Sequence, residues 1–159
     1  MVELSVRGSG DHCEQLSAVK ALVKELELTD WVELTGYLTG CELLENLSSF
    51  DIGVIPDIKN CYTDNITMNQ VFEYTFLAKP IVGFQLRETM DLVGPCGVFA
   101  QEETPEALAK AILMLINDPV LRSGLGEGGR SRARELFSWS AEAKKLIDAY
   151  ANLRSTLQH

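Results

Sequence analysis

Short apolar runs alternate with amphipathic helical stretches up to Ala100, and this alternation constrains the fold more than any other feature of the sequence. Val2–Arg7 predicts a strand that leads into a glycine-rich turn, and apolar residues at helical spacing follow over His12–Glu27. Because strands that alternate with helices favour a parallel sheet with right-handed crossovers, the sequence predicts an α/β fold with a Rossmann-like parallel sheet and helices on both faces. The other predicted strands are Trp31–Thr35, Asp51–Ile55, Pro80–Phe84 and Gly97–Ala100, with a short helix around Leu43, Leu44 and Leu47.

From Pro105 onward, only helical spacing is visible. One stripe of apolar residues follows Pro105, Asp118-Pro119 opens the next helix, and a last helix is marked by Leu146, Ile147, Tyr150 and Leu153. Residues 119–159 are therefore predicted to be carboxyl-terminal helices, and Gly124–Gly129 is interpreted as a turn between two of them. We find no repeat or linker, so residues 1–159 are interpreted as a single domain.

Charge, hydropathy and the spacing of cysteine and histidine disfavour several classes of protein. The 159 residues carry a formal net charge of −9, which disfavours nucleic-acid binding because that affinity depends largely on Lys and Arg. No stretch is long and apolar enough for a transmembrane segment, and Met1–Gly10 lacks the pattern of a signal peptide, so a cytoplasmic protein is predicted. The four cysteines and two histidines have no metal-ligand spacing, and we expect no metal.

The most informative segment is the polar loop Asp57–Ile66 with the helix after it. The loop is longer than most connections between a strand and a helix, which favours a functional role. Thr67 and Gln70 have the spacing of a capping box, and Glu73 is the only charged residue from Met68 to Ala78. A carboxylate on so apolar a helix either faces solvent along a narrow polar stripe or faces a polar ligand.

Six sequence segments together resemble the carboxyl-terminal domain of retaining GT-B glycosyltransferases of the glycosyl transferases group 1, or family 4, type. Phe72-Glu73-Tyr74 followed by Ala78-Lys79-Pro80-Ile81-Val82 resembles the family's signature of a glutamate, a helix and G-K-P-V-V. The other segments occur in the family's order, and the resemblance covers nearly all of the chain; they are Leu4–Gly10, Leu28–Gly36, Asp51–Pro56, Thr104–Asp118 and Phe137-Ser138-Trp139.

The resemblance implies the function. It implies a domain that binds a nucleoside-diphosphate sugar for an enzyme that transfers a hexose to a glycan or another acceptor, as in polysaccharide biosynthesis. No cofactor other than this donor substrate is implied. The alternative is a catalytically inactive GT-B-like domain that serves as a binding or scaffold partner. A response-regulator-like module would need an acidic pair after the first strand, where this chain has Arg7-Gly8-Ser9.

The resemblance also implies the catalytic positions. In the family, a pair of glutamates is separated by seven residues; the second matches Glu73 and the first falls on Asn65. The second glutamate accepts hydrogen bonds from the ribose, while the first meets hydroxyls of the transferred sugar. An amide still forms hydrogen bonds but carries no charge that favours a positive transition state. The family's glycine before Lys79 is Ala78.

Further donor-binding residues follow from the resemblance and from the ends of the strands. Backbone N–H groups of Ile66, Thr67 and Met68 are expected to face the donor, because a helix amino terminus has unpaired donors. The turn Gly8, Ser9 and Gly10 either lets the backbone approach the donor or is only a tight turn. By analogy with the family, the base lies near Gly36 and Tyr37, where Tyr37 either stacks on it or packs internally.

The resemblance further implies that the chain is a fragment. The family's amino-terminal acceptor domain and its first strand and helix, with a phosphate-binding Arg and Lys, precede the part matched here. We therefore expect the isolated chain not to be a competent enzyme, its partner to be the missing amino-terminal domain, and the longer protein to be cytoplasmic or peripheral to a membrane. Loss of the first strand predicts pairing of Val2–Arg7 with Asp51–Ile55, or self-association through an open sheet edge.

Overall fold

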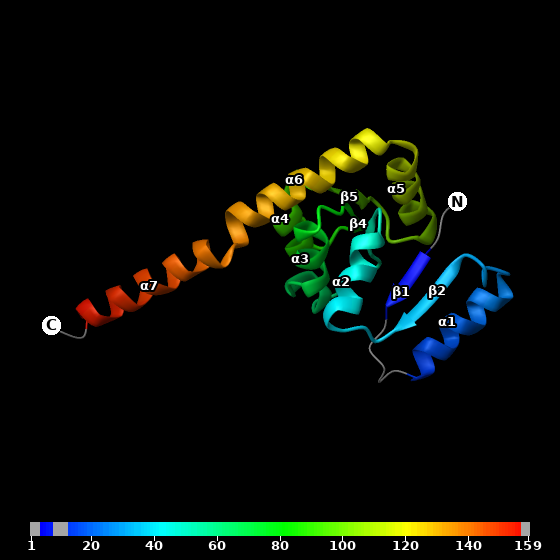
Figure 1. Cartoon of the computed structure of the whole chain (residues 1–159), viewed down its shortest axis with the longest axis horizontal. Coiled ribbons are helices and arrows are strands. Elements are labelled where there is room, and N and C mark those ends of the chain that lie inside the picture. The colour runs from blue at the N-terminus through cyan, green and yellow to red at the C-terminus, as the bar shows by residue number, and fades with distance from the viewer. Residues whose placement is uncertain (1–3, 8–12, 157–159) are drawn as a thin grey trace. The chain divides into compact units, whose positions relative to one another are not determined.

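The computed structural model describes residues 4–7 and 13–156, which divide into two compact units, Met1–Asn46 and Leu47–His159. The elements follow the chain in the order shown in Figure 1: β1 (Leu4–Arg7), α1 (Cys13–Glu25), β2 (Val32–Gly36), α2 (Gly40–Ser49), β3 (Gly53–Ile55), the 3-10 turn η1 (Thr63–Asn65), α3 (Asn69–Phe76), β4 (Ile81–Phe84), α4 (Arg87–Val93), the 3-10 turn η2 (Gly94–Cys96), β5 (Gly97–Ala100), α5 (Pro105–Asn117), α6 (Pro119–Phe137) and α7 (Trp139–Thr156).

The first unit contains a two-stranded parallel sheet and α1. Strand β1 pairs with β2, with Leu4 opposite Val32 and Val6 opposite Leu34. Gly36 ends β2 with a φ of 70°, a left-handed conformation that glycine adopts without steric strain. The chain then turns into α2, in which the boundary between the units falls.

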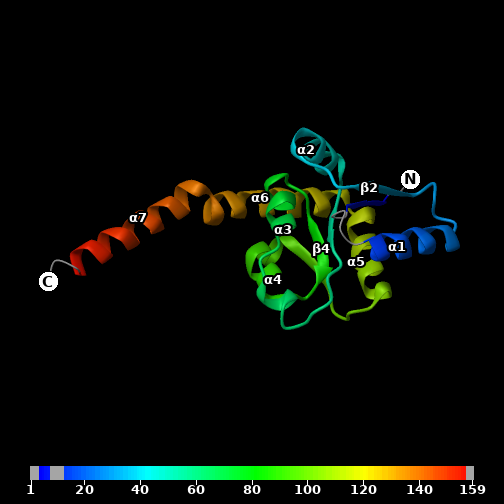
Figure 2. The ribbon, with the colours of Figure 1, turned by 90° about the horizontal axis from the view of Figure 1, so that it is seen from below.

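The second unit contains a three-stranded parallel sheet with the order β3-β4-β5. The central strand β4 is buried along its whole length, and its side chains alternate between two apolar clusters. Ile81 belongs to the cluster that includes Val71 of α3 and Leu92 of α4, while Val82 belongs to the cluster that includes Leu115 of α5. Figure 2 shows α3 and α4 on one side of β4 and α5 on the other. The predicted α/β architecture, with a parallel sheet and helices on both faces, is therefore confirmed.

The strand pairings of the described residues lie within each unit. Strand β1 pairs with β2 in the first unit, and β3 pairs with β4 in the second. The predicted pairing of Val2–Arg7 with Asp51–Ile55, or self-association through an open sheet edge, stays a prediction. The prediction assumed a gap four or five residues long beside the third strand. Strand β3 has only three residues, so fewer backbone groups along its edge require partners than that argument assumed.

The predicted turn at Gly124–Gly129 is also wrong, because these residues lie inside the continuous helix α6. Gly126, Gly129 and Ala133 are all buried and recur on one face of this helix. A Cβ atom on Gly126 would lie 2.1 Å from the carbonyl oxygen of Ala78. The glycines therefore serve close packing between α6 and neighbouring backbone rather than a change of chain direction.

The start of α3 differs from the predicted capping box. The N-cap is Met68, whose extended backbone leads into a helix that begins at Asn69, and no side chain caps it. Thr67 therefore lies one residue too early to act as the N-cap. The capping-box pattern alone does not determine where a helix begins, because most helical stability comes from tertiary packing. Here the buried side chain of Val71 also contributes to the position of the helix.

The end of α3 is a Schellman motif with alanine at the position that favours glycine. The N–H of Lys79 donates to the carbonyl of Tyr74 at 2.9 Å, and the N–H of Ala78 donates to that of Thr75 at 3.1 Å. Ala78 has a φ of 57°, in the left-handed region. Its Cβ makes this conformation unfavourable by about 1–2 kcal/mol relative to glycine.

We expect Ala78→Gly to raise the free energy of unfolding by about 1 kcal/mol, because it relieves the left-handed strain at a small cost in chain entropy. Chemical denaturation of both proteins measures this difference. The matched control is Ala109→Gly at an exposed position inside α5, which should lower stability by about 1 kcal/mol. Equal destabilisation by both substitutions would contradict the strain at Ala78.

Candidate functional site at the carboxyl edge of the second unit

The three parallel strands of the second unit end at the same edge of the sheet, where α/β proteins usually bind ligands. The segment after β3 is the predicted polar loop, the segment after β4 leads into α4, and the segment after β5 contains Glu103. Polar contacts join these three segments in the structure. This edge is therefore the candidate site.

The loop after β3 has a defined internal structure. The side-chain oxygen of Asn60 accepts hydrogen bonds from the backbone N–H groups of Tyr62 at 2.8 Å and Thr63 at 3.0 Å. The hydroxyl of Thr63 donates to the carbonyl of Ile58 at 2.8 Å. These contacts form the turn that precedes η1 and present Asp64 and Asn65 toward α4.

Two hydrogen bonds tie the loop to the neighbouring strand ends. The backbone N–H of Lys59 donates to the Glu103 carboxylate at 2.9 Å, and the backbone N–H of Arg87 donates to the Asp64 carboxylate at 2.8 Å. The ammonium of Lys59 also lies 3.2 Å from Asp64. The hydrogen bond from Arg87, followed by the contact with Lys59, lowers the pKa of Asp64 below its ordinary value of 3.8.

Asn65, predicted to face the transferred sugar, has both ends of its amide engaged within the chain. Its Nδ2 donates to the carbonyl of Cys61 at 2.8 Å, and its Oδ1 accepts a hydrogen bond from the guanidinium of Arg87. The side chain is otherwise exposed at the carboxyl edge. Its role toward a sugar stays a prediction, now with a defined orientation of the amide.

Glu73 lies in the middle of α3, on the face opposite the buried residues of this helix. Val71 and Thr75, two residues before and two residues after Glu73, are only 1% and 2% exposed. Because an α-helix turns by about 100° per residue, the Glu73 side chain points almost opposite to both of them. Glu73 is half-buried and takes part in an interaction within the chain. Its predicted contact with a ribose stays a prediction.

The remaining predicted residues fall into three groups. Ile66, Thr67 and Met68 form the extended segment between η1 and α3, so the first turn of the helix begins just after them. Gly36 ends β2 in the first unit, and Tyr37, which follows it, is 71% exposed. Gly8, Ser9 and Gly10 lie outside the described residues, so their predicted role stays untested.

Four polar residues of this edge escaped the sequence analysis: Lys59, Asp64, Arg87 and Glu103. Arg87 follows the predicted strand Pro80–Phe84 by three residues, but no sequence motif connects it to Asn65, 22 residues earlier. The helix α4 that begins at Arg87 was also missed, since its seven residues are too few for a clear periodicity.

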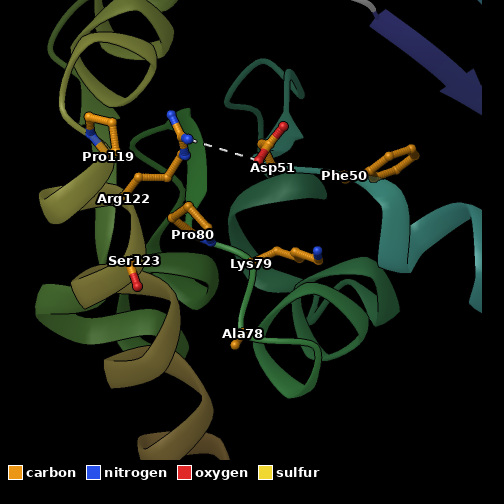
Figure 3. A pocket seen from close by; sticks show the side chains of 8 residues that line it. All are labelled: Phe50, Asp51, Ala78, Lys79, Pro80, Pro119, Arg122 and Ser123. Carbon is orange, nitrogen blue, oxygen red and sulfur yellow. Dashed lines mark ion pairs between the residues drawn. The ribbon is translucent and has the colours of Figure 1, made fainter.

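A shallow cavity of about 260 Å³ lies at the opposite, amino-terminal edge of the same sheet, between Asp51, Lys79 and Arg122 (Figure 3). The two cations of the cavity, Lys79 and Arg122, both donate hydrogen bonds to backbone carbonyl groups. The Lys79 ammonium donates to Ser48 at 2.7 Å near the end of α2, and the Arg122 guanidinium donates to Leu115 at 3.0 Å near the end of α5. These cations stabilise helix carboxyl termini, so we do not assign a donor site to this cavity.

Within residues 4–7 and 13–156, no group of three or more His, Cys, Asp or Glu side chains is arranged to hold a metal ion. The same part of the chain contains no helix with the length and apolar character needed to cross a membrane.

Comparison with known protein families gives a match at residues 1–118 to the model of the family Glycosyl transferases group 1. Among curated proteins, an MMP alpha-(1->4)-mannosyltransferase of Mycolicibacterium hassiacum is 29% identical over 132 residues, which cover 81% of this chain and 31% of the relative. A D-inositol 3-phosphate glycosyltransferase of Kineococcus radiotolerans is 23% identical over 89% of this chain and 34% of the relative. The chain thus spans about a third of the length of these relatives.

Solved structures show the same fold. Sucrose-phosphate synthase from Thermosynechococcus elongatus superposes with a TM-score of 0.80 and 24% identity over 97% of this chain and 39% of that chain. Anabaena Alr3699/HepE in complex with UDP superposes with a TM-score of 0.82 and 13% identity over 95% and 41% of the two chains. The fold of the chain is thus that of a half-domain of GT-B glycosyltransferases.

Proposed function

Since the chain belongs to the glycosyl transferases group 1 family, we propose that it is the donor-binding, carboxyl-terminal half of a retaining GT-B glycosyltransferase. The longer protein would transfer a hexose from a nucleoside-diphosphate sugar to a glycan or another acceptor, with the acceptor held by an amino-terminal domain. The family match over residues 1–118 is the observation that carries this proposal.

The carboxyl edge of the second unit supports the proposed location of the donor. Its polar groups come from the ends of β3, β4 and β5, which is where parallel α/β sheets place ligands. In this proposal the Glu73 carboxylate accepts hydrogen bonds from the ribose hydroxyls, and the exposed side of Asn65 faces the transferred sugar. The first backbone N–H groups of α3 face the donor phosphates.

The absence of a carboxylate at Asn65 affects transfer more than binding. A neutral amide gives no charge stabilisation to a positively charged transition state at the sugar. It still accepts and donates hydrogen bonds, so a bound donor loses less than the transition state does. The proposal therefore expects donor binding together with slow transfer.

A thermal-shift panel tests the proposed function directly. Uridine, guanosine and adenosine diphosphates are each titrated into the chain at millimolar concentrations, with inorganic pyrophosphate as the control for simple anion binding. Uridine diphosphate is the first ligand to test, because HepE has been solved with UDP and with UDP-glucose. We expect one nucleoside diphosphate to raise the melting temperature saturably and more than pyrophosphate does. No shift with any of the three would contradict the proposal.

A further inference from the structure

Arg87 occupies a distinctive position at the carboxyl edge of the second unit. It is the first residue of α4 and follows the end of β4 by three positions. Its side chain is 58% exposed, although its guanidinium is held by the Oδ1 atom of Asn65. The group is therefore both oriented and accessible to a ligand.

The two cations of this edge differ in how their charge is compensated. The ammonium of Lys59 lies 3.2 Å from the Asp64 carboxylate, which is a direct ion pair. Asp64 accepts a hydrogen bond from the backbone N–H of Arg87, and the charge of the guanidinium acts on Asp64 only at longer range. The guanidinium of Arg87 instead contacts the neutral amide of Asn65, and among the described residues its ion pair is with Glu88, at a longer distance of 3.4 Å.

Arg87 consequently keeps both positive charge and donor groups for a ligand. A guanidinium has five N–H donors, and only those of Nη2 contact Asn65 and Glu88 in this arrangement. The chain as a whole carries a formal charge of −9, so an anionic ligand requires a local cation to overcome repulsion. Arginine is well suited to phosphate, because its planar fork binds two phosphate oxygens at once.

We infer that Arg87 binds the diphosphate of the nucleotide donor, and that Asn65 is a positioning residue that holds its guanidinium toward the ligand. This inference rests on the proposed function and adds a phosphate-binding residue to it. It also gives Asn65 a second role, because its Oδ1 atom orients Arg87 without neutralising it.

Calorimetric titrations of the same chain test this inference. The ligands are the nucleoside diphosphate that the wild type binds, the matching nucleoside and inorganic pyrophosphate. We expect Arg87→Gln to weaken diphosphate binding about tenfold and to leave nucleoside binding unchanged within about twofold. Arg87→Lys keeps the charge but loses the fork, so its loss should be smaller. Asn65→Ala should also weaken the diphosphate, by less than Arg87→Gln does.

Arg134→Gln is the matched control, because it removes the same charge from an exposed position on α6 and should change none of the affinities. Equal binding of the diphosphate by the wild type and Arg87→Gln would overturn the inference while leaving the proposed function intact. An equal loss of nucleoside and diphosphate would overturn it too, since it would indicate a structural role. A wild type that binds none of the three ligands would instead contradict the proposed function. Thermal unfolding of each variant shows whether the variant is folded. If Arg87→Gln does not fold, the diphosphate affinity of Arg87→Lys is compared with that of the wild type instead.

Discussion

Replacing Gly126 by alanine should lower the free energy of unfolding by about 2–3 kcal/mol, although alanine is the better helix former. The added Cβ would lie 2.1 Å from the carbonyl oxygen of Ala78 and 2.9 Å from its carbonyl carbon. Both atoms are backbone and cannot rotate away as a side chain can. The helix α6 would therefore have to move off the end of α3, which separates buried surfaces.

Urea denaturation of Gly126→Ala measures this loss, and the same helix offers a matched control. Gly124 has no atom within 4 Å of an added Cβ. Gly124→Ala should therefore raise stability by about 0.5–1 kcal/mol through helix propensity alone. If both substitutions stabilised the protein, the close contact between α6 and Ala78 would not exist in solution.

Glu73→Gln should weaken nucleoside-diphosphate binding by about 1–2 kcal/mol, which is roughly a five- to thirtyfold loss of affinity. In the proposed site, the ribose hydroxyls lose a charged acceptor and keep a neutral one. Asn65→Ala should have a smaller effect, because Asn65 faces a sugar that a nucleoside diphosphate lacks and supports the phosphates only through Arg87.

Calorimetric titration of both variants with the same nucleoside diphosphate tests this order. Glu135→Gln, an identical change at an exposed position of α6, is the control and should bind as the wild type does. Equal losses for Glu73→Gln and Asn65→Ala would show that the division of roles between ribose and sugar is wrong.

The parts of the fold that local chemistry determines could be predicted from sequence. Strand β5 matches its predicted range Gly97–Ala100, because a short apolar run bounded by turn residues has few alternatives. Helix α5 begins at Pro105 as expected, with Thr104 as N-cap; its hydroxyl accepts the N–H of Ala107 at 3.2 Å. Such signals lie within a few residues of the element that they specify.

Features that depend on distant contacts could not be predicted. The glycines of residues 124–129 suggest a turn when only their neighbours in sequence are considered. In the structure, Gly126 instead faces the backbone of Ala78, 48 residues earlier. A Cβ atom added to Gly129 would lie 3.6 Å from the methyl carbon of Thr75. The same composition serves a turn or a close helix contact, and only the tertiary structure distinguishes them.

The candidate site was predictable to a similar extent. The sequence predicts a functional loop after Asp51–Ile55 and a neighbouring strand over Pro80–Phe84, and the parallel sheet brings the ends of both strands together. The contacts of Arg87 with Asp64 and Asn65 depend on the short helix α4 and on the register between β3 and β4. A single sequence contains no signal for such pairs, because the residues are far apart and ordinary in type.

Chemical-shift mapping by NMR can show whether a nucleotide donor binds at the carboxyl edge of the second unit. A nucleoside diphosphate is titrated into the isotopically labelled chain, and the backbone amide resonances are followed. We expect saturable shifts concentrated in residues 57–74 and 83–88. Shifts confined to the opposite edge, around Asp51, Lys79 and Arg122, would contradict it.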